Sequence, residues 1–194
     1  MEKIGVFIAR MQPLHNAHVF LINELLKKHQ RVCVVLGSAN KKDMIRNPYP
    51  LELRLEILKE VLGEYDFNRL TIFELPDWGL ENDVQEPKMW GMYLYFNIVS
   101  RMKCKYMEFI YSDSIDIINN WFKDTVVEKY VEIDHRNREV LFDGLSATKI
   151  REAIFQKDLE YLIKYTPQPV YNRLDMLSTI WKNVLDKPKD DFRL

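Results

Sequence analysis

Apolar residues along this chain fall into two alternating patterns, and the alternation predicts an α/β fold with a parallel sheet. Short apolar runs, typical of buried strands, predict strands at residues 4–8, 31–36, 70–75, 106–111 and 126–133, the last with a break expected near Lys129. Longer segments with apolar residues at helical spacing predict helices at residues 16–28, 51–62, 88–102, 115–122 and 146–155. We therefore predict a doubly wound parallel sheet of the Rossmann-like kind.

The last part of the chain is predicted to be helical. The pattern runs over residues 158–185, with interruptions expected at Pro167 and Pro169. We predict one domain over residues 1–165 and a helical C-terminal extension over residues 166–194 that packs on the same domain.

The junction between the first strand and the first helix carries the clearest candidate chemistry. Residues 5–18 read Gly-Val-Phe-Ile-Ala-Arg-Met-Gln-Pro-Leu-His-Asn-Ala-His. His15 and His18 are three residues apart, and on a first helical turn this spacing points both rings the same way. A helix N-terminus carries free N–H groups and partial positive charge, so two imidazoles and Arg10 there indicate a phosphate site. The simpler interpretation is one capping histidine and one surface histidine.

A second candidate lies far downstream, where residues 145–151 read Leu-Ser-Ala-Thr-Lys-Ile-Arg. Ser146 is a good N-cap, and Gly144 gives the chain freedom to turn into the helix. Thr148 and Arg151 lie one turn apart on the same face. A hydroxyl and a guanidinium beside free helix N–H groups suit a polyphosphate. Taken alone, this segment is equally an ordinary capped helix with a surface arginine.

Both segments resemble motifs of the nucleotidylyltransferase superfamily. Residues 10–18 resemble the G-R-x-Q-P-x-H-x-G-H opening of archaeal-type nicotinamide-nucleotide adenylyltransferases, and residues 145–151 resemble the superfamily's I-S-x-T-x-x-R motif. Partial support comes from Gly37-Ser-Ala-Asn40, from Arg46-Asn-Pro-Tyr49, which is similar to the family's N-P-F/Y, and from Arg54. The resemblance covers about residues 4–165.

The resemblance implies a Rossmann-like nucleotidylyltransferase fold and transfer of AMP from ATP to nicotinamide mononucleotide, giving NAD and pyrophosphate, with Mg²⁺ bridging the ATP phosphates. It implies catalytic roles for His15, His18 and Arg151. It implies contacts with the ATP phosphates and ribose for Arg10, Gln12, Ser146, Thr148 and Asp113, and acceptor contacts for Asn47, Arg54 and Trp90. For Trp90, helix core is an equally good interpretation, because aromatic residues at helical spacing are usually buried.

Two departures from the family pattern leave the activity open. Ala9 and Ala17 stand where the family usually has glycine, and one added methyl group at each place would narrow a nucleotide pocket. The alternatives are therefore another phosphorylated acceptor, such as nicotinate mononucleotide or a sugar-alcohol phosphate, and a degenerate nucleotide-binding module without turnover. A transition-metal site at His15 and His18 lacks a third ligand placed by the sequence.

Composition narrows the partners. The formal net charge of −1 argues against broad attraction to nucleic acid or to an anionic membrane. Cys33 and Cys104 form no disulfide or metal framework by their spacing. The chain enters a strand without a signal peptide and contains no apolar stretch of transmembrane length, so we expect a cytoplasmic protein. The sequence leaves open whether it forms a homo-oligomer.

Overall fold

The sheet has five parallel strands, and the direction in which the chain adds successive strands reverses at the centre of the sheet. The structure is a computed structural model that describes residues 2–41, 44–77 and 86–187. The strand order is β3-β2-β1-β4-β5. The strands are β1 (Ile4–Ala9), β2 (Val32–Gly37), β3 (Leu70–Leu75), β4 (Met107–Tyr111) and β5 (Val131–His135). Since the chain proceeds outward from β1 to β3 and then returns to β4 beside β1, the switch point lies between β1 and β4, where open α/β sheets bind ligands.

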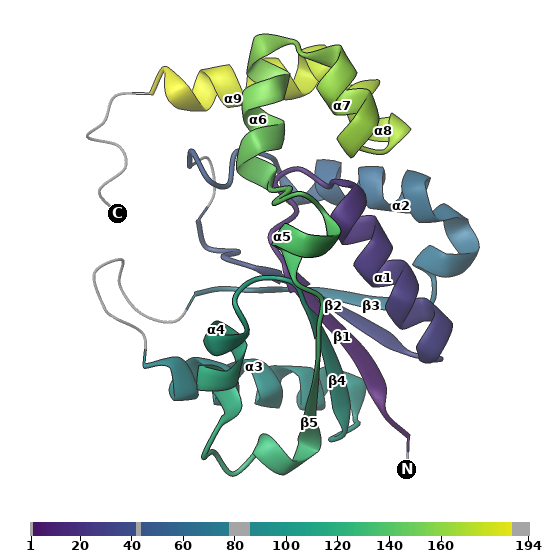
Figure 1. The fold of residues 1–194 in the computed structure, drawn as a ribbon, viewed down its shortest axis with the longest axis vertical. Coiled ribbons are helices and arrows are strands. Elements are labelled where there is room, and N and C mark those ends of the chain that lie inside the picture. Colours follow the sequence, from purple (N-terminus) through teal and green to yellow (C-terminus); the bar gives the residue numbers. More distant parts are fainter. Residues whose placement is uncertain (1, 42–43, 78–85, 188–194) are drawn as a thin grey trace.

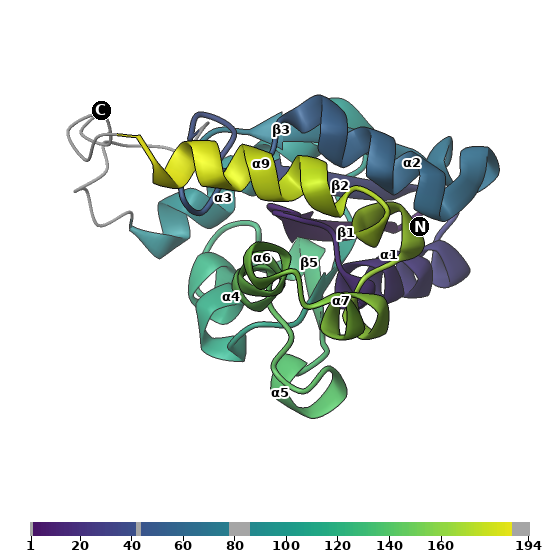
Figure 2. The ribbon, with the colours of Figure 1, turned by 90° about the horizontal axis from the view of Figure 1, so that it is seen from above.

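Helices cover both faces of the sheet, as Figures 1 and 2 show. One face carries α1 (Asn16–Lys28) and α2 (Leu51–Phe67), and the other carries α3 (Pro87–Met102) and α4 (Ile115–Phe122). After β5 follow α5 (Arg138–Leu141), α6 (Ala147–Gln156), α7 (Leu159–Tyr165), α8 (Gln168–Tyr171) and α9 (Leu174–Leu185). The predicted doubly wound sheet is confirmed.

Helix α1 shows how the sequence pattern produces the packing. Ala17, Leu21 and Leu25 recur at intervals of four, so they form one apolar stripe, and each is at most 2% exposed. The stripe packs against β1 and β2 within one core cluster. Burying a leucine side chain contributes about 1.5–3 kcal/mol, so this face fixes the helix and with it the position of the helix N-terminus.

Two details of the predicted elements are wrong. The strand predicted at residues 126–133 begins only at Val131, and the break expected near Lys129 is a 3₁₀ turn over Glu128–Tyr130. Local hydrogen bonds turn the chain there: the Thr125 hydroxyl donates to the Phe122 carbonyl (2.6 Å), and the Asp124 N–H donates to the Glu128 carboxylate (2.9 Å).

The second correction concerns Pro169. The helical pattern does break at Pro167, as expected, but Pro169 lies within the first turn of α8. A first helical turn tolerates proline because its N–H groups need no intrahelical acceptor. The next break falls instead between α8 and α9.

The C-terminal helices share the core of the sheet domain. Val170, Leu177 and Trp181 belong to the same buried cluster as the residues of α1 and α2. Arg173, the N-cap residue of α9, donates hydrogen bonds to Glu56 (2.8 Å) and to Glu60 of α2. Helix α9 is therefore anchored to α2 at its start, and it packs against α6, which it crosses in the view of Figure 2.

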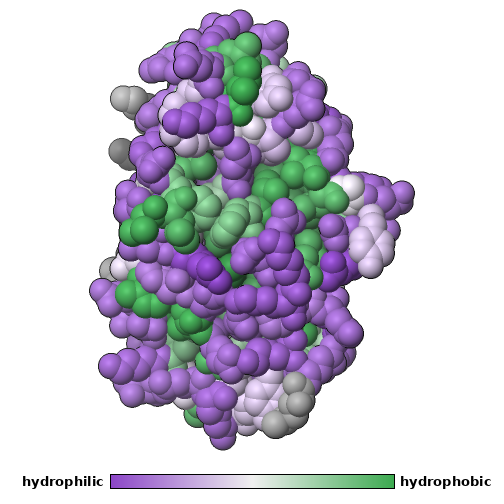
Figure 3. Space-filling view, turned by 45° about the vertical axis from the view of Figure 1, so that its right-hand side comes forward, coloured by the Kyte–Doolittle hydropathy of each residue, from purple (hydrophilic) through white to green (hydrophobic). Residues whose placement is uncertain are grey.

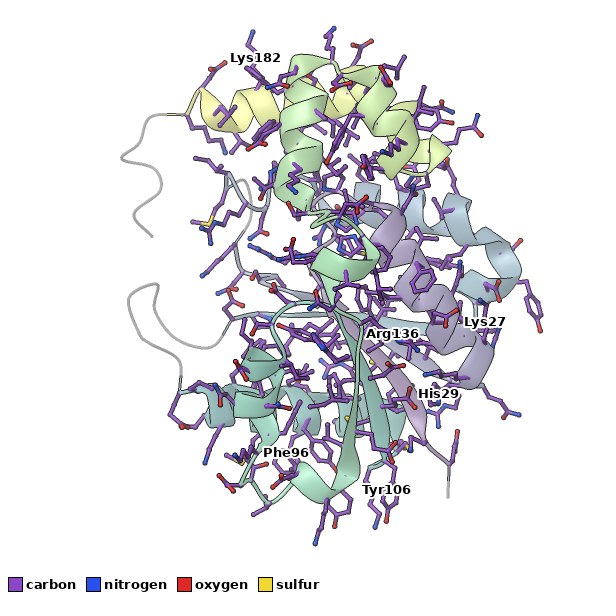
Figure 4. The ribbon with its side chains drawn as sticks, viewed as in Figure 1. Lys27, His29, Phe96, Tyr106, Arg136 and Lys182 are labelled. Atoms are coloured by element: carbon purple, nitrogen blue, oxygen red, sulfur yellow. The ribbon has the colours of Figure 1, made fainter. Side chains whose placement is uncertain are left out.

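A group of charges ties the C-terminal end of α1 to β4 and β5. Lys28 pairs with Glu108 (3.0 Å) and Asp134 (2.6 Å), and Arg136 pairs with the same aspartate at 2.7 Å. Figure 4 labels Arg136 and the neighbouring His29 in this region. Partly exposed ion pairs of this kind each contribute little to the free energy of folding. We therefore expect these charges to orient α1 on the sheet more than to stabilise the protein.

The face drawn in Figure 3 is largely polar, with apolar patches across its middle. Among the described residues, no helix is long and apolar enough to cross a membrane.

Candidate functional site

A cavity of about 720 Å³ opens at the carboxyl ends of the strands, at the switch point of the sheet. Its lining includes the ends of β1, β2 and β4, the N-terminal turns of α1 and α6, and residues of α3 and α4. All of the residues predicted for catalysis and ATP contact meet there: Arg10, Gln12, His15, His18, Asp113, Ser146, Thr148 and Arg151. The cavity thus joins segments that are far apart in the sequence.

We call Arg10, His15, His18, Thr148 and Arg151 the polar wall of this cavity. The His15 and His18 rings stack, with centroids 3.6 Å apart and planes 18° from parallel. The Nδ1 atoms of both rings are enclosed, and neither has a hydrogen-bond partner within the described part of the chain. Helix α1 also begins here without a side-chain cap from His15. These ring atoms and the free helix N–H groups are suited to an incoming anion.

Burial keeps both histidines uncharged in the free protein. Desolvation lowers the pKa of His15 well below its ordinary value, with His18 and Arg138 contributing smaller effects. Desolvation likewise lowers the pKa of His18 to about 3. At neutral pH the two imidazoles are therefore neutral N–H donors, and an anionic ligand would favour their protonation.

The guanidinium of Arg151 is buried beside the histidines. Its Nη1 donates to the Gln12 carbonyl (2.6 Å) and its Nη2 donates to the Thr148 hydroxyl (3.2 Å). Its Nε is enclosed without a partner among the described residues. Ser146 caps α6 by accepting a hydrogen bond from the Lys149 N–H at 3.3 Å. The second predicted motif is thus joined to the first through the Gln12 backbone.

Gln12 and Arg54 brace the loop after β1. The Gln12 side chain exchanges two hydrogen bonds with the backbone of Tyr49, at 2.8 and 3.1 Å. Arg54 donates to the Arg10 carbonyl at 2.8 Å and lies 3.7 Å from Glu74. Arg54 does not line the main cavity, and its contacts position the backbone of Arg10.

Two of the predicted acceptor residues lie at a smaller cavity of about 100 Å³. Asn47 and Arg54 line this cavity, and Gln12, Ser38 and Lys41 line both it and the main cavity. The Asn47 Oδ1 is buried and without a hydrogen-bond partner in the described residues. The two cavities are thus adjacent, and the acceptor roles of Asn47 and Arg54 stay predictions.

Trp90, Tyr111 and Trp121 form what we call the aromatic wall of the main cavity. Trp90 is 9% exposed and belongs to the core cluster beneath α3 and α4, so it is both core and cavity lining. Its ring meets the Trp121 ring edge to face at 6.4 Å, and Trp121 meets Tyr111 in the same way at 5.7 Å. These helices lie on the opposite face of the sheet from α1.

Gly91 allows α3 and α4 to approach each other at this wall. A methyl group at Gly91 would lie 2.1 Å from the Trp121 carbonyl oxygen, which no side chain can accept without a shift of the backbone. The glycine therefore sets the spacing that brings Trp121 beside Trp90.

Several residues that line the cavity were assigned no role there from the sequence: Lys41, Asp77, Tyr111, Trp121 and Arg138. Asp77 accepts a hydrogen bond from the Ser38 hydroxyl (3.2 Å) and pairs with Lys41 (3.2 Å). Arg138 lies 3.4 Å from the Asp113 carboxylate. Position after a strand was a usable signal for Asp77, whereas Arg138 belongs to a charged segment without a motif. Trp78, the residue after Asp77, lies outside the described residues.

Neither of the two alanines that replace family glycines closes the cavity. Ala9 and Ala17 both line it, and Ala17 is 2% exposed within the core stripe of α1. The described residues contain no group of three or more His, Cys, Asp or Glu that could hold a metal ion. The transition-metal interpretation of His15 and His18 therefore gains no third ligand from the described part of the fold.

Comparisons with known proteins give results that agree with this geometry. The model of the cytidylyltransferase-like family matches residues 6–153. The chain is 26% identical over 157 residues to the nicotinamide-nucleotide adenylyltransferase of Thermococcus onnurineus, covering 80% of this chain and 74% of that one. It is 31% identical over 83 residues to the enzyme of the same name from Pyrobaculum arsenaticum, covering 42% of this chain and 46%, under half, of that relative.

A solved structure has the same fold. It is a bifunctional NMN adenylyltransferase/ADP ribose pyrophosphatase from Francisella tularensis, complexed with AMP and a manganese ion, with a TM-score of 0.69 and 18% identity. The similarity covers 99% of this chain and 54% of that one. The family model spans most of the chain, and the motifs it includes meet at one cavity. The chain belongs to the cytidylyltransferase-like family, and the predicted membership of the nucleotidylyltransferase superfamily is confirmed.

Proposed function

We propose that this protein transfers AMP from ATP to nicotinamide mononucleotide, releasing pyrophosphate and forming NAD. One observation carries the proposal: a cavity at the switch point has a wall of anion-binding groups from two helix starts and, on another side, a wall of aromatic rings. The first is suited to a triphosphate and the second to a flat pyridine ring. The names of the relatives support the same choice.

The chemistry needs no protein nucleophile. An oxygen of the acceptor 5′-phosphate attacks the α-phosphorus of ATP, the new P–O bond forms, and the bond from the α-phosphorus to the bridging oxygen breaks. The electron pair leaves with pyrophosphate. We assign His15 and His18 to the α- and β-phosphates as N–H donors, and Arg10, Thr148 and Arg151 to the polyphosphate. Catalysis then consists of positioning and of stabilising the charge that develops on the phosphates.

Magnesium would arrive on the phosphates. Asp77 and Asp113 are carboxylates of the described cavity lining, and each is already paired, with Lys41 and Arg138 respectively. Since Mg²⁺ binds readily through substrate phosphates and water, it needs few protein ligands. The bound ion would neutralise part of the phosphate charge. We assign Asp113 to a contact with the ATP ribose.

The aromatic wall is our site for the acceptor base. Nicotinamide mononucleotide carries a cationic pyridinium, and a tryptophan face attracts cations by roughly 0.5–2 kcal/mol. Trp90 is the first choice for this contact, with Trp121 beside it. Asn47 and Arg54 remain candidates for the acceptor through the adjacent small cavity.

Pyrophosphate release with a panel of substrates tests the proposal. ATP and CTP serve as donors, and nicotinamide mononucleotide, nicotinate mononucleotide and a sugar-alcohol phosphate serve as acceptors. We expect release with ATP and nicotinamide mononucleotide, and NAD as the product by chromatography. A preference for another acceptor would change the proposed substrate but leave the proposed nucleotidyl transfer in place. Nucleotide binding without pyrophosphate release from any pair would identify a degenerate binding module.

A further inference from the structure

Helix α9 touches the site through Trp181. The centre of the Arg151 guanidinium lies 5.8 Å from the centroid of the Trp181 ring, within the range of a cation–π interaction. Trp181 is 8% exposed, and Phe155 of α6 packs edge to face against it at 5.8 Å. The contact therefore joins the helix that carries Arg151 to the C-terminal helix, for which the sequence supplied no motif.

We propose that Trp181 is a positioning residue that orients Arg151 toward the polyphosphate. The proposal rests on the role assigned to Arg151 above. The Gln12 carbonyl and the Thr148 hydroxyl each accept one N–H bond from the guanidinium, and the guanidinium carbon lies over the indole ring. Together the three contacts restrict the position of the group.

An indole is suited to this task because it uses none of the N–H groups of the arginine. A guanidinium has five N–H donors, and the two hydrogen bonds above use two of them. Within the described residues the Arg151 guanidinium bonds to a carbonyl and a hydroxyl rather than to a carboxylate, and its Nε has no partner. A carboxylate would hold the side chain equally well but would neutralise its charge and compete with a phosphate.

The anchoring of α9 supports a positioning role. Arg173 at the start of the helix is bound to Glu56 and Glu60 of α2, and Leu177 and Val184 are buried on the same side as Trp181. The helix is thus anchored at its start and buried along the face that carries the indole, so the indole can hold Arg151 in a fixed position.

The test measures binding of ATP and of inorganic tripolyphosphate by calorimetry, without an acceptor, in the full chain. Trp181→Leu keeps an apolar side chain but removes the aromatic face, and we expect binding of both probes to weaken roughly 2- to 30-fold, the range of one cation–π contact. Trp181→Phe should restore most of the affinity. AMP, which lacks the distal phosphates, should be affected less.

Leu177→Ala is the matched control, since it removes a buried side chain from the same helix without a contact to Arg151. It should lower the melting temperature and leave both affinities within about twofold, because a loss of packing alone does not move the guanidinium. In an Arg151→Gln background, Trp181→Leu should weaken ATP binding no further, because the contact that Trp181 makes with Arg151 is already lost.

Equal affinities for the parent and Trp181→Leu would overturn the inference, as would equal losses in Trp181→Leu and Leu177→Ala. Failure of the parent to bind either probe would overturn it together with the proposed function. Binding that depends on Trp181 in a protein that releases no pyrophosphate would retain the positioning role and reject the reaction.

Discussion

The polar wall and the aromatic wall of the cavity are built in different ways. The polar wall comes from two short segments, residues 10–18 and 146–151, each running into the first turn of a helix. The aromatic wall takes one ring each from α3, β4 and α4, and a close backbone contact at Gly91 sets its spacing. Each half of the first wall can therefore be identified from local sequence, whereas the second wall has no local signal, and the fold brings the parts of both walls together.

The walls also differ in what they contribute to the folded state. The enclosed Nδ1 atoms of His15 and His18 and the Nε of Arg151 lack partners in the described structure, and such groups cost stability. Trp90, by contrast, packs within a core cluster. Substitutions in the polar wall should therefore affect turnover more than stability, and substitutions in the aromatic wall should affect stability and acceptor binding.

The largest effect is expected at Trp90. Trp90→Ala should lower the free energy of unfolding by about 3–5 kcal/mol, since it removes a buried aromatic side chain, and should raise the acceptor KM while sparing kcat. Denaturant titration and steady-state kinetics measure the two quantities, with Trp90→Phe as the control that keeps a ring. A large loss of stability with an unchanged acceptor KM would leave Trp90 only its role in the core.

His18→Ala tests the polar wall. It should lower kcat by about 10²- to 10³-fold, the usual loss for one charge-stabilising donor, while the melting temperature stays close to that of the parent. The small structural effect is expected because the Nδ1 has no partner to lose among the described residues. Turnover close to that of the parent would reject the assignment of this histidine.

Arg151→Ala sharpens the assignment of the phosphates. It should weaken the binding of ATP by roughly 10- to 100-fold, as expected for the loss of charged hydrogen bonds, and should weaken the binding of AMP less. Arg151→Lys should restore only part of the affinity, since lysine lacks the planar fork. Equal losses for ATP and AMP in calorimetry would remove Arg151 from the distal phosphates.

Gly91→Ala breaks the spacing of the aromatic wall. The added methyl group overlaps the Trp121 carbonyl, so we expect a loss of about 1–3 kcal/mol in unfolding free energy and a higher acceptor KM. Gly37→Ala is the control for stability, because no atom lies within 4 Å of a methyl group built there. An unchanged melting temperature in Gly91→Ala would contradict the contact between α3 and α4.

The smallest effect concerns pH. The pKa of His18 is about 3 in the folded protein and near 6.5 unfolded, so the unfolded chain binds more protons between these values. As the pH falls below 6.5, the free energy of unfolding should decrease by roughly 1 kcal/mol per pH unit. The melting temperature should decrease by about 2–4 °C per pH unit. Melting curves of the parent between pH 7 and 5 should fall more steeply than those of His18→Asn. Parallel slopes would argue against a neutral His18 in the folded protein.

The polar wall shows how far the sequence leads. The spacing of His15 and His18 predicted rings that point the same way, and the rings stack in the structure. Ser146 was predicted to be an N-cap, and its hydroxyl accepts a hydrogen bond from the Lys149 N–H, as an N-cap side chain does. Both predictions succeeded because a helix start depends on residues within one turn of it.

The sequence by itself determined the alternating elements, the doubly wound sheet and the two segments that we propose bind phosphate, because periodicity and capping are local properties. Only the tertiary structure decided that the Gln12 carbonyl joins these segments through Arg151, and that Arg54 braces the backbone of Arg10. It also decided that Trp121 stands beside Trp90 and that Trp181 covers Arg151. These contacts join residues distant in the chain, and their geometry depends on how helices pack on the sheet, which no local pattern encodes.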